Sequence, residues 1–320
     1  MMTHDKVPTL LVNQSFNSID HWIQAIGWDM DFRQIEPGLL NARAVGFGHA
    51  GIMVMRVELN RSFHQLGSPP AGFQTFGLPD KESGTLRWSG AETPPGVLIN
   101  FSYEEELDCV NQGPMGGYIF SFSEDTLNRA SETLGLDSGF VGSIQENRFW
   151  VPHGNEHEHL RQVLRALERV AVCDGDEGLE QWGEVFNTDL VTLVVRILAM
   201  DSSAARLVAP SFRLAAMNRS LKILSEHDQP SLSIEALCTM VGASWATLER
   251  AFKDEFGMAP KQYIKSKRLS AVKSELIKTG PDAVISNVAH HWGFQHMSSF
   301  AKDYRKQFGE LPSETLGHLK

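Results

Sequence analysis

The side chains best suited to recognition chemistry lie on two helices of the C-terminal third, whose outer faces carry small polar and basic residues. Arg250 on the first helix could donate two hydrogen bonds to guanine, and Glu249 could accept one from the amino group of cytosine. Ala246 on the first helix and Met297 on the second could contact a thymine methyl group. If these side chains face a DNA duplex, the chemistry is direct recognition of base edges in its major groove.

Motifs that would indicate catalysis or cofactor binding are weaker than this recognition pattern. Residues 46–51 match G-x-G-x-x-G, but the next residues predict a strand, whereas a dinucleotide site needs a helix there, so a turn is favoured. His153, His157 and His159 cluster near a predicted helix start, where solvated side chains are favoured over a metal site. Because no nucleophile–base pair, metal-binding cysteine set or phosphate loop emerges, we expect neither enzymatic activity nor a cofactor.

The two helices belong to a layout that occurs twice in residues 231–316. In each copy a short apolar helix ends at a glycine, Gly242 or Gly293, a residue type that adopts positive φ at little cost. A second helix follows, with apolar residues at i, i+3 and i+4 spacing. Gly242 and Gly293 are 51 residues apart, whereas Gly257 and Gly309 are 52 apart, so the copies differ by one residue in the turn.

This layout predicts two helix-turn-helix motifs, at residues 233–256 and 284–308. The second helix of each motif is the recognition helix, which would enter a major groove. Residues 260–278 between the motifs predict a basic helix that begins with proline. At 1.5 Å per residue this helix would span ~27 Å, enough to hold the recognition helices about one DNA turn apart.

Length and charge both divide the chain into two domains. A chain of 320 residues is expected to form about two domains, and residues 201–211 break the helical pattern. We therefore expect a sensor domain at 1–205, a linker at 206–211 and a DNA-binding domain at 212–320. From residue 212 onward there are 15 Lys and Arg against 11 Asp and Glu, a net charge of +4, although the whole chain carries −10. The basic C-terminal part fits contact with DNA phosphates, and the acidic part should stand away from DNA.

Cysteine usage and hydropathy indicate a cytoplasmic protein with no membrane partner. The three cysteines have no metal or redox spacing and are expected to be reduced thiols. The N-terminus has no signal segment, and the longest apolar run, at 190–200, is far shorter than a bilayer span.

The N-terminal part predicts a β-rich fold followed by helices, so the chain as a whole is α+β. Residues 32–122 contain short strands separated by Gly, Pro, Asn and Asp clusters, which is typical of an antiparallel sandwich or a cupin-like barrel. Helices are predicted at 156–172 and 179–200. The apolar face of 179–200 is broad enough to pack on its own domain and on a second subunit, so a homodimer through this helix is a hypothesis.

A small β domain can bind a ligand in its mouth. Aromatic residues are dense in this region, and Glu92 with the acidic balance would suit a cationic ligand such as an amine. For any single aromatic residue, a place in the core is the alternative. The candidate ligand contacts are Phe73, Phe76, Trp88, Glu92 and Phe101.

Roughly the last 100 residues resemble the AraC/XylS family of transcriptional regulators. The resemblance rests on I-x-x-L-C-x-x-V-G at 234–242, G-x-x-P at 257–260, W-G-F-x-x-x-S-x-F at 292–300 and Y-R-x-x-F-G-x-x-P-S at 304–313. The extra residue in the second turn is also a family feature. Within the family, W-G-F and the following Asp-Tyr pair look like the ethanolamine-operon and amine-catabolism regulators.

The resemblance implies which side chains contact DNA. The base-facing positions are Ala246, Thr247, Glu249 and Arg250 on the first recognition helix and Met297, Ser298, Ser299 and Lys302 on the second. Lys253, Arg305 and Lys306 lie later on these helices, where phosphate is the expected partner. We expect more of the base readout from the first helix and more of the backbone contact from the second.

These observations predict a transcriptional regulator that responds to a ligand. We favour an activator of a catabolic operon, with a role related to amines. Its expected partners are double-stranded DNA, a small-molecule effector, RNA polymerase and a second copy of the chain. Two alternatives stay open. One is a cupin-like metal enzyme fused to a DNA-binding tail, and the other is a constitutive DNA-binding protein without a ligand.

Overall fold

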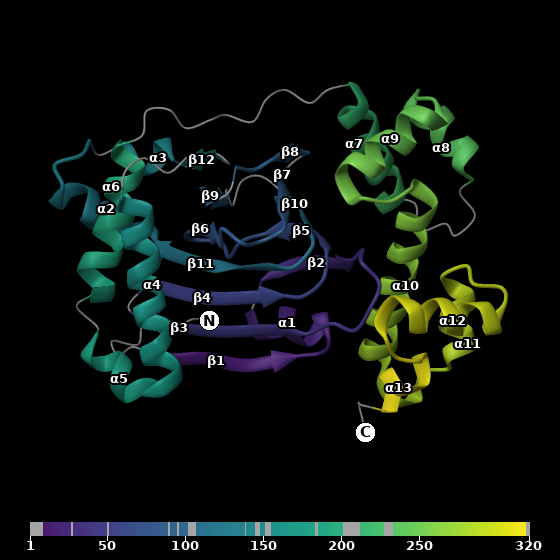
Figure 1. The fold of residues 1–320 in the computed structure, drawn as a ribbon, viewed down its shortest axis with the longest axis horizontal. Coiled ribbons are helices and arrows are strands. Elements are labelled where there is room, and N and C mark those ends of the chain that lie inside the picture. The colour runs from purple at the N-terminus through teal and green to yellow at the C-terminus, as the bar shows by residue number, and fades with distance from the viewer. Residues whose placement is uncertain are drawn as a thin grey trace.

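The structure, a computed structural model, joins an N-terminal unit of two sheets and flanking helices to an all-helical C-terminal unit (Figure 1). The residues it describes are 9–26, 28–49, 51–88, 90–94, 96–101, 107–137, 139–144, 148–150, 155–182, 185–200, 212–226 and 233–317. The predicted linker at 206–211 lies outside them. This architecture matches the expected order of a β-rich part followed by a helical part.

The strands of the N-terminal unit form two antiparallel sheets. Over the described ranges the larger sheet has seven strands and the smaller has five. The larger sheet, in spatial order, contains β1 (Thr9–Phe16), β3 (Ala42–His49), β4 (Ile52–Leu59), β11 (Met115–Ser123), β6 (Phe73–Pro79), β9 (Leu98–Phe101) and β12 (Arg148–Trp150). The smaller sheet contains β2 (Asp29–Gln34), β5 (Phe63–Ser68), β10 (Leu107–Gln112), β7 (Thr85–Trp88) and β8 (Ala91–Glu92). The glycine-rich motif at 46–51 lies in the β3–β4 hairpin, where Gly51 has φ 84° and a strand follows, as expected for a turn.

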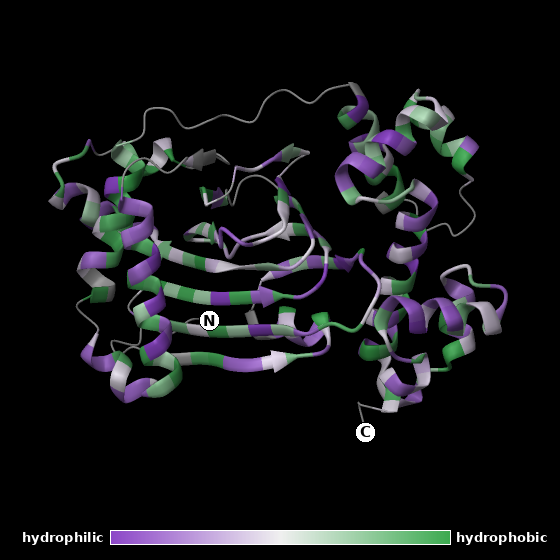
Figure 2. Cartoon of the chain, in the orientation of Figure 1, coloured by the Kyte–Doolittle hydropathy of each residue, from purple (hydrophilic) through white to green (hydrophobic). Residues whose placement is uncertain are grey.

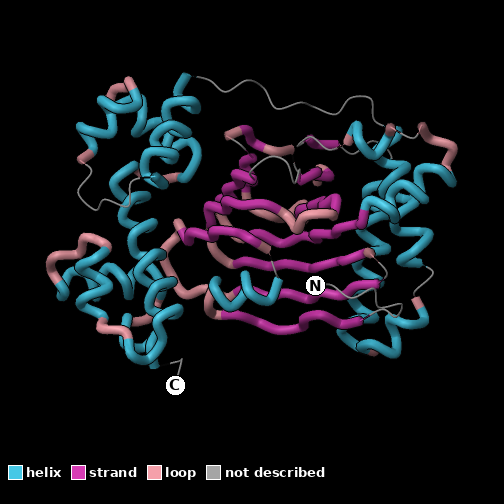
Figure 3. Tube along the Cα trace, turned by 180° about the vertical axis from the view of Figure 1, so that it is seen from behind, coloured by secondary structure: helices cyan, strands magenta, loops and turns pink. Residues whose placement is uncertain are grey.

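The larger sheet is covered on both faces, which gives the N-terminal unit three layers. One face packs Phe76 and Phe120 against Leu164 and Val194 of the helices. These helices include α2 (Glu124–Thr133), α3 (Phe140–Ser143), α4 (Glu156–Cys173), α5 (Gly175–Gln181) and α6 (Val191–Met200). The opposite face packs against the smaller sheet and α1 (Ile19–Ile26), which Figure 3 shows in front of the strands. Two apolar cores therefore lie on either side of one sheet.

The segment at 179–200 differs from the single long helix expected from its sequence. Helix α5 ends at Gln181, a π-helical turn covers Val185–Leu190, and α6 begins only at Val191. Leu193 and Ile197 are buried in the core of their own unit, with 7% and 4% of their surface exposed. The prediction of one continuous helix is wrong, and these two residues are already used within the subunit. Dimerisation itself stays a prediction.

The C-terminal unit is built on one long helix, α10 (Pro260–Thr279). Its other helices are α7 (Phe212–Glu226), α8 (Ile234–Val241), α9 (Trp245–Phe256), α11 (Ile285–His291), α12 (Met297–Phe308) and α13 (Pro312–Gly317), with a 3-10 turn at Gly280–Asp282. Figure 1 shows α8 and α9 at one end of α10 and α11 and α12 at the other. Separate apolar clusters join each helix pair to α10, through Ile264 at the first end and Leu269 and Val272 at the second.

Hydropathy along these helices follows their packing. In Figure 2 hydrophilic and hydrophobic positions alternate around the helices of both units, as expected for helices that bury one face. Among the helices of the described ranges, none combines the length and the apolar character needed to cross a bilayer.

Candidate nucleic-acid interface

The first helix pair has a polar residue at the start of each helix and a glycine between them. Ser233 accepts a hydrogen bond from the backbone N–H of Ala236 at 3.2 Å, and Ser244 accepts one from Thr247 at 3.2 Å. Such caps satisfy backbone donors that the first turn of a helix leaves unpaired. Gly242 between the helices has φ 66°, a conformation that favours glycine. The turn therefore takes only three residues.

The outward face of α9 offers fewer free groups than the sequence suggested. Ala246 and Arg250 are exposed, and no described residue pairs with the Arg250 guanidinium. Glu249 instead forms an ion pair with Lys253, 3.0 Å apart, and the Thr247 hydroxyl lies 2.9 Å from the Ser244 hydroxyl. A pair this exposed is worth only ~0–1 kcal/mol, so DNA could separate it at small cost. Arg250 is the side chain on α9 most ready to contact a base.

The outward face of α12 differs in kind. Ser298, Ser299, Lys302 and Arg305 are exposed, and no hydrogen bond or ion pair within the described ranges occupies their side chains. Met297, in contrast, is half-buried and packs on the apolar core of its own helix pair. Its expected contact with a thymine methyl group is therefore limited to the exposed part of the side chain.

The basic residues of α10 are largely used inside the protein. Lys265 pairs with Asp303 at 2.5 Å, and Lys273 pairs with Glu310 at 2.9 Å with only 8% of its side chain exposed. These contacts attach α10 to α12 and to the segment after it. The basic character of this helix therefore supports the position of α12 more than it supports phosphate contact.

Both helix pairs are attached to the smaller sheet. At the end of α9, the buried Glu255 carboxylate lies 2.8 Å from Arg87 of β7. Burial raises the pKa of Glu255, although Arg87 acts in the opposite direction. Near α12, the Gln34 side chain donates to the backbone carbonyl of Gln307 at 3.0 Å, and the Gln307 side chain donates to that of Gln34 at 2.7 Å.

The start of α10 contributes a third contact. The Tyr263 hydroxyl lies 2.6 Å from Nδ1 of His64 and accepts from Arg33 at 3.3 Å. Nε2 of the same histidine lies 3.0 Å from Asp108. Burial raises the pKa of Tyr263 to about 12, so the hydroxyl keeps its proton at physiological pH. The helical spacing of apolar residues indicates that Tyr263 is buried, but no sequence pattern indicates that Arg33, His64 and Asp108 are its partners.

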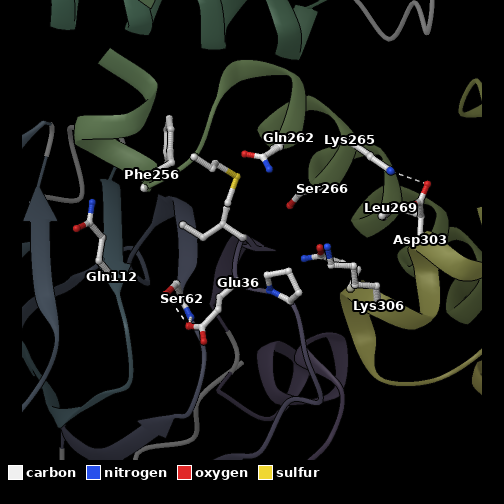
Figure 4. Close-up of a pocket in the computed structure, with 15 residues that line it drawn as sticks. Glu36, Ser62, Gln112, Phe256, Gln262, Lys265, Ser266, Leu269, Asp303 and Lys306 are labelled. Carbon is white, nitrogen blue, oxygen red and sulfur yellow. Dashed lines mark hydrogen bonds and ion pairs between the residues drawn. The ribbon is translucent and has the colours of Figure 1, made fainter. Parts of the chain in front are cut away.

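A groove of about 490 Å³ lies between the two units, beside these contacts. Figure 4 shows Glu36 and Ser62 of the N-terminal unit on one side of the groove, and Lys265 and Lys306 of the C-terminal unit on the other. The Glu36 carboxylate accepts a hydrogen bond from the Ser62 hydroxyl at 2.9 Å. Lys306 therefore lies next to the N-terminal unit, unlike the other basic residues expected at phosphates.

The structure separates the five residues expected to bind a ligand. Trp88 and Phe101 line a small apolar cavity of about 50 Å³ between the two sheets. Phe76 points to the opposite face of the larger sheet and packs against the helices, and Phe73 is not part of the cavity wall. Glu92 is exposed, 3.8 Å from Arg87. The five residues therefore do not line one cavity, because the larger sheet is buried on both faces and aromatic residues fill both cores.

The chemistry of the cavity is apolar with a few polar groups. The buried indole N–H of Trp22 has no hydrogen-bond partner, and this residue lines the cavity with Gln65 and Cys109. Burial raises the pKa of the Cys109 thiol well above its ordinary value. No carboxylate is among the described residues of the wall. In the same ranges no group of three or more His, Cys, Asp or Glu could hold a metal ion, so the metal-enzyme alternative has no ligand set there.

Comparison with known proteins agrees with this geometry. Residues 237–318 match a family model described as a helix-turn-helix domain. The XylDLEGF operon transcriptional activator 3 of Pseudomonas putida is 30% identical over 230 residues, which are 71% of this chain and 66%, about two thirds, of that protein. The HTH-type transcriptional activator RhaS of Escherichia fergusonii is 25% identical over 49% of this chain and 53% of its own length.

Among solved structures, ToxT from Vibrio cholerae is 14% identical over 84% of this chain and 99% of that chain. Its TM-score of 0.31 is too low to bear on fold or function. The conclusion rests instead on the two helix pairs, the helix-turn-helix match and the aligned regulators. This protein belongs to the AraC/XylS family of transcriptional regulators.

Proposed function

We propose that this chain activates transcription by placing α9 and α12 in successive segments of the major groove. The observation that carries the proposal is the attachment of both helix pairs to the 20-residue helix α10. At 1.5 Å per residue α10 is ~30 Å long, close to one turn of DNA. Relatives named as operon activators support activation rather than repression.

The two recognition helices would contribute differently. Arg250 of α9 is exposed and unpaired within the described ranges, which suits a bidentate contact with guanine. Ser298 and Ser299 of α12 offer short hydroxyl groups. Lys302, a base-facing position by the family resemblance, and Arg305 offer positive charge, which we assign to phosphates. We therefore assign more of the base selection to α9 and more of the backbone contact to α12.

The cavity between the sheets is our candidate effector site. Its aromatic wall and the unpaired Trp22 N–H favour a small, flat, apolar molecule that carries a hydrogen-bond acceptor. An amine effector has weaker support, because Glu92 faces solvent and does not line the cavity. About 50 Å³ is little room for such a molecule, so an effector would have to widen the space between the sheets.

The remaining parts of the proposal follow from the relatives. The P. putida activators are named for the XylDLEGF operon, and control of a catabolic operon by this chain is our extension of that likeness. Activation would involve RNA polymerase as a partner. A homodimer remains part of the proposal; Leu193 and Ile197 are buried within the subunit, whereas Trp182 of the same predicted face is exposed.

The DNA-binding part is tested by replacing Arg250 with alanine in the full chain. The matched control is Arg213→Ala, which removes an exposed arginine of α7 whose partner is Asp254, at 3.3 Å. Affinity is measured by fluorescence anisotropy on a duplex selected for binding and on a random duplex. We expect Arg250→Ala to cost ~1–3 kcal/mol on the selected duplex and much less on the random one. Equal losses on both duplexes would make Arg250 a phosphate contact and contradict its assigned role.

A further inference from the structure

We infer that the smaller sheet is a shared wall which couples the cavity to the first recognition helix, with Glu255 and Tyr263 as positioning residues. The inference rests on the proposed function, because it concerns how an effector would change DNA affinity. Its basis is that one face of this sheet lines the cavity while the other face holds the C-terminal unit. A widening of the cavity on the side of the smaller sheet therefore moves a surface to which α9 and α10 are attached.

Alternation along the strands shows the two roles of the sheet. In β7, Leu86 and Trp88 line the cavity, whereas Arg87 between them reaches Glu255. Successive side chains of a strand point to opposite faces, so a displacement of β7 that makes room near Trp88 also displaces Arg87. The cavity and the C-terminal unit are therefore connected through residues that are adjacent in the sequence of β7.

The neighbouring strands repeat the arrangement. In β10, Leu107 and Cys109 line the cavity, while Val110 packs in a cluster with Phe252 and Phe256 of α9. In β2 and β5, the inward residues are Met30, Phe32 and Gln65, and the outward residues are Arg33 and His64. All four strands therefore connect the cavity to the C-terminal unit.

The outward contacts are buried and directional, so small displacements would be transmitted. Arg87 approaches Glu255 to 2.8 Å, and Gln112 donates to the Glu255 backbone carbonyl at 2.7 Å. The last turn of α9 is thus fixed through a side chain and through its backbone. Tyr263, with 1% of its surface exposed, fixes the start of α10 through its hydroxyl group. Close-packed interiors transmit displacement instead of absorbing it.

The second recognition helix is attached differently. Gln307 of α12 bonds the backbone of Gln34 at the end of β2, and the groove shown in Figure 4 lies between this contact and the end of α9. Side chains therefore do not fill the whole space between the two attachment points. A movement of the smaller sheet can change the position of α9 relative to α12. The distance between these two helices determines which spacing of recognition sites on DNA they fit.

Such coupling is reciprocal. If an occupied cavity changes DNA affinity by some factor, bound DNA changes the affinity of the cavity for its occupant by the same factor. Coupling between two sites in a protein is typically about 5- to 150-fold. We expect a value in this range for the intact wall, and a value below about 2-fold once the side-chain contacts of Arg87 and Tyr263 are removed.

The experiment mimics an occupant with Cys109→Phe, which adds volume to the cavity from the wall itself. The matched control is Ala171→Met, which adds volume to the other core, between the larger sheet and the helices, where Ala171 is 1% exposed. Each change is made in the natural chain and in an Arg87→Met, Tyr263→Phe background, which lacks the ion pair to Glu255 and the hydrogen bonds of the Tyr263 hydroxyl. If Cys109→Phe lowers the thermal midpoint more than the control does, the milder Cys109→Met replaces it.

Two readouts separate the inference from the proposed function. Hydrogen exchange of the amides at 253–257 reports the last turn of α9, and anisotropy on a selected duplex reports DNA affinity. We expect Cys109→Phe to change both by at least about 5-fold in the natural chain and by less than about 2-fold in the background. Ala171→Met should change neither.

If Cys109→Phe has the same effect in the natural chain and in the background, the effects of the substitutions are additive. That result would overturn the shared-wall inference, while DNA binding stands. A chain that binds no duplex but still shows the exchange response would overturn the proposed function while the link from the cavity to α9 stands.

Discussion

Removal of the Arg87 guanidinium tests how firmly the N-terminal unit holds α9. Arg87→Met keeps most of the side-chain length and removes the partner of Glu255. Only 4% of the Glu255 side chain and 18% of that of Arg87 are exposed, so the carboxylate would be left buried and unpaired. Breaking a buried ion pair by removing one partner typically costs ~3–5 kcal/mol.

Two effects limit this loss. The C-terminal unit can separate from the sheet and return Glu255 to water, so the loss cannot exceed the free energy of docking. Burial already raises the pKa of Glu255, and the loss of Arg87 should raise it further, so the carboxyl can also accept a proton. Because the docked state then binds the proton more tightly than the separated state, docking in the variant should improve as the pH falls from 8 towards the raised pKa.

The assay is hydrogen exchange of the amides at 253–257, which lie in the last turn of α9 and just beyond it. The control is Arg213→Met, which removes the exposed pair of the adjacent residue Asp254, with side-chain exposures of 53% and 60%. A surface pair contributes ~0–1 kcal/mol, so the control should change protection by less than about tenfold. Arg87→Met should lower protection by about 2 to 3.5 orders of magnitude at most.

Equal protection in the two variants at pH 8 would refute this reasoning. The ion pair would then contribute no more than a surface contact. A deficit that grows as the pH falls would refute the assignment of the effect to an unpaired Glu255 carboxylate.

Three further predictions concern other parts of the chain. Gly242→Ala should destabilise the first helix pair by ~1–2 kcal/mol in thermal unfolding, because φ 66° is strained for alanine; an unchanged midpoint would contradict this. In the native chain, iodoacetamide should modify the exposed Cys173 well before the buried Cys109, whose thiol pKa is raised by burial, and mass spectrometry that finds Cys109 labelled first would contradict the packing of the cavity wall. Lys302→Ala should weaken binding to selected and random duplexes alike and reduce the salt slope by about 1, whereas a loss confined to the selected duplex would assign Lys302 to base readout.

The helix pairs could be predicted because their sequence signals are local. Gly242 supplies the positive φ of the turn, and Ser233 and Ser244 cap the two helices, all within a dozen residues. Apolar spacing then identifies the buried face of each helix. The end of α8 and the start of α9 follow from these features without knowledge of the rest of the fold, whereas His296 before α12 makes no side-chain cap.

The contacts between the units could not be predicted, because they join residues far apart in sequence. Gln34 and Gln307, which bond each other's backbone, are 273 residues apart and belong to no periodic pattern. Nor could the ligand set be assigned. In a sheet buried on both faces, polar and apolar residues do not alternate clearly, so nothing in the sequence shows that Phe76 and Phe101 belong to different cores.

The segment at 179–200 shows a third limit. Its apolar spacing fits a helix on average, and the π-helical turn at Val185–Leu190 shifts the faces without changing composition. The apolar residues of this segment then pack in the core of their own unit. Hydrophobic spacing predicted burial correctly for Leu193 and Ile197 but could not say against what they are buried.

Selection of binding sites from a random duplex library by the full chain tests the central claim most directly. Two recognition helices held at the ends of α10 should enrich two short motifs with centres about 10 base pairs apart, on one face of the duplex. Arg250→Ala should relax selection within one motif and leave the other unchanged. Enrichment of no motif, or of a single motif that is insensitive to Arg250→Ala, would contradict the account.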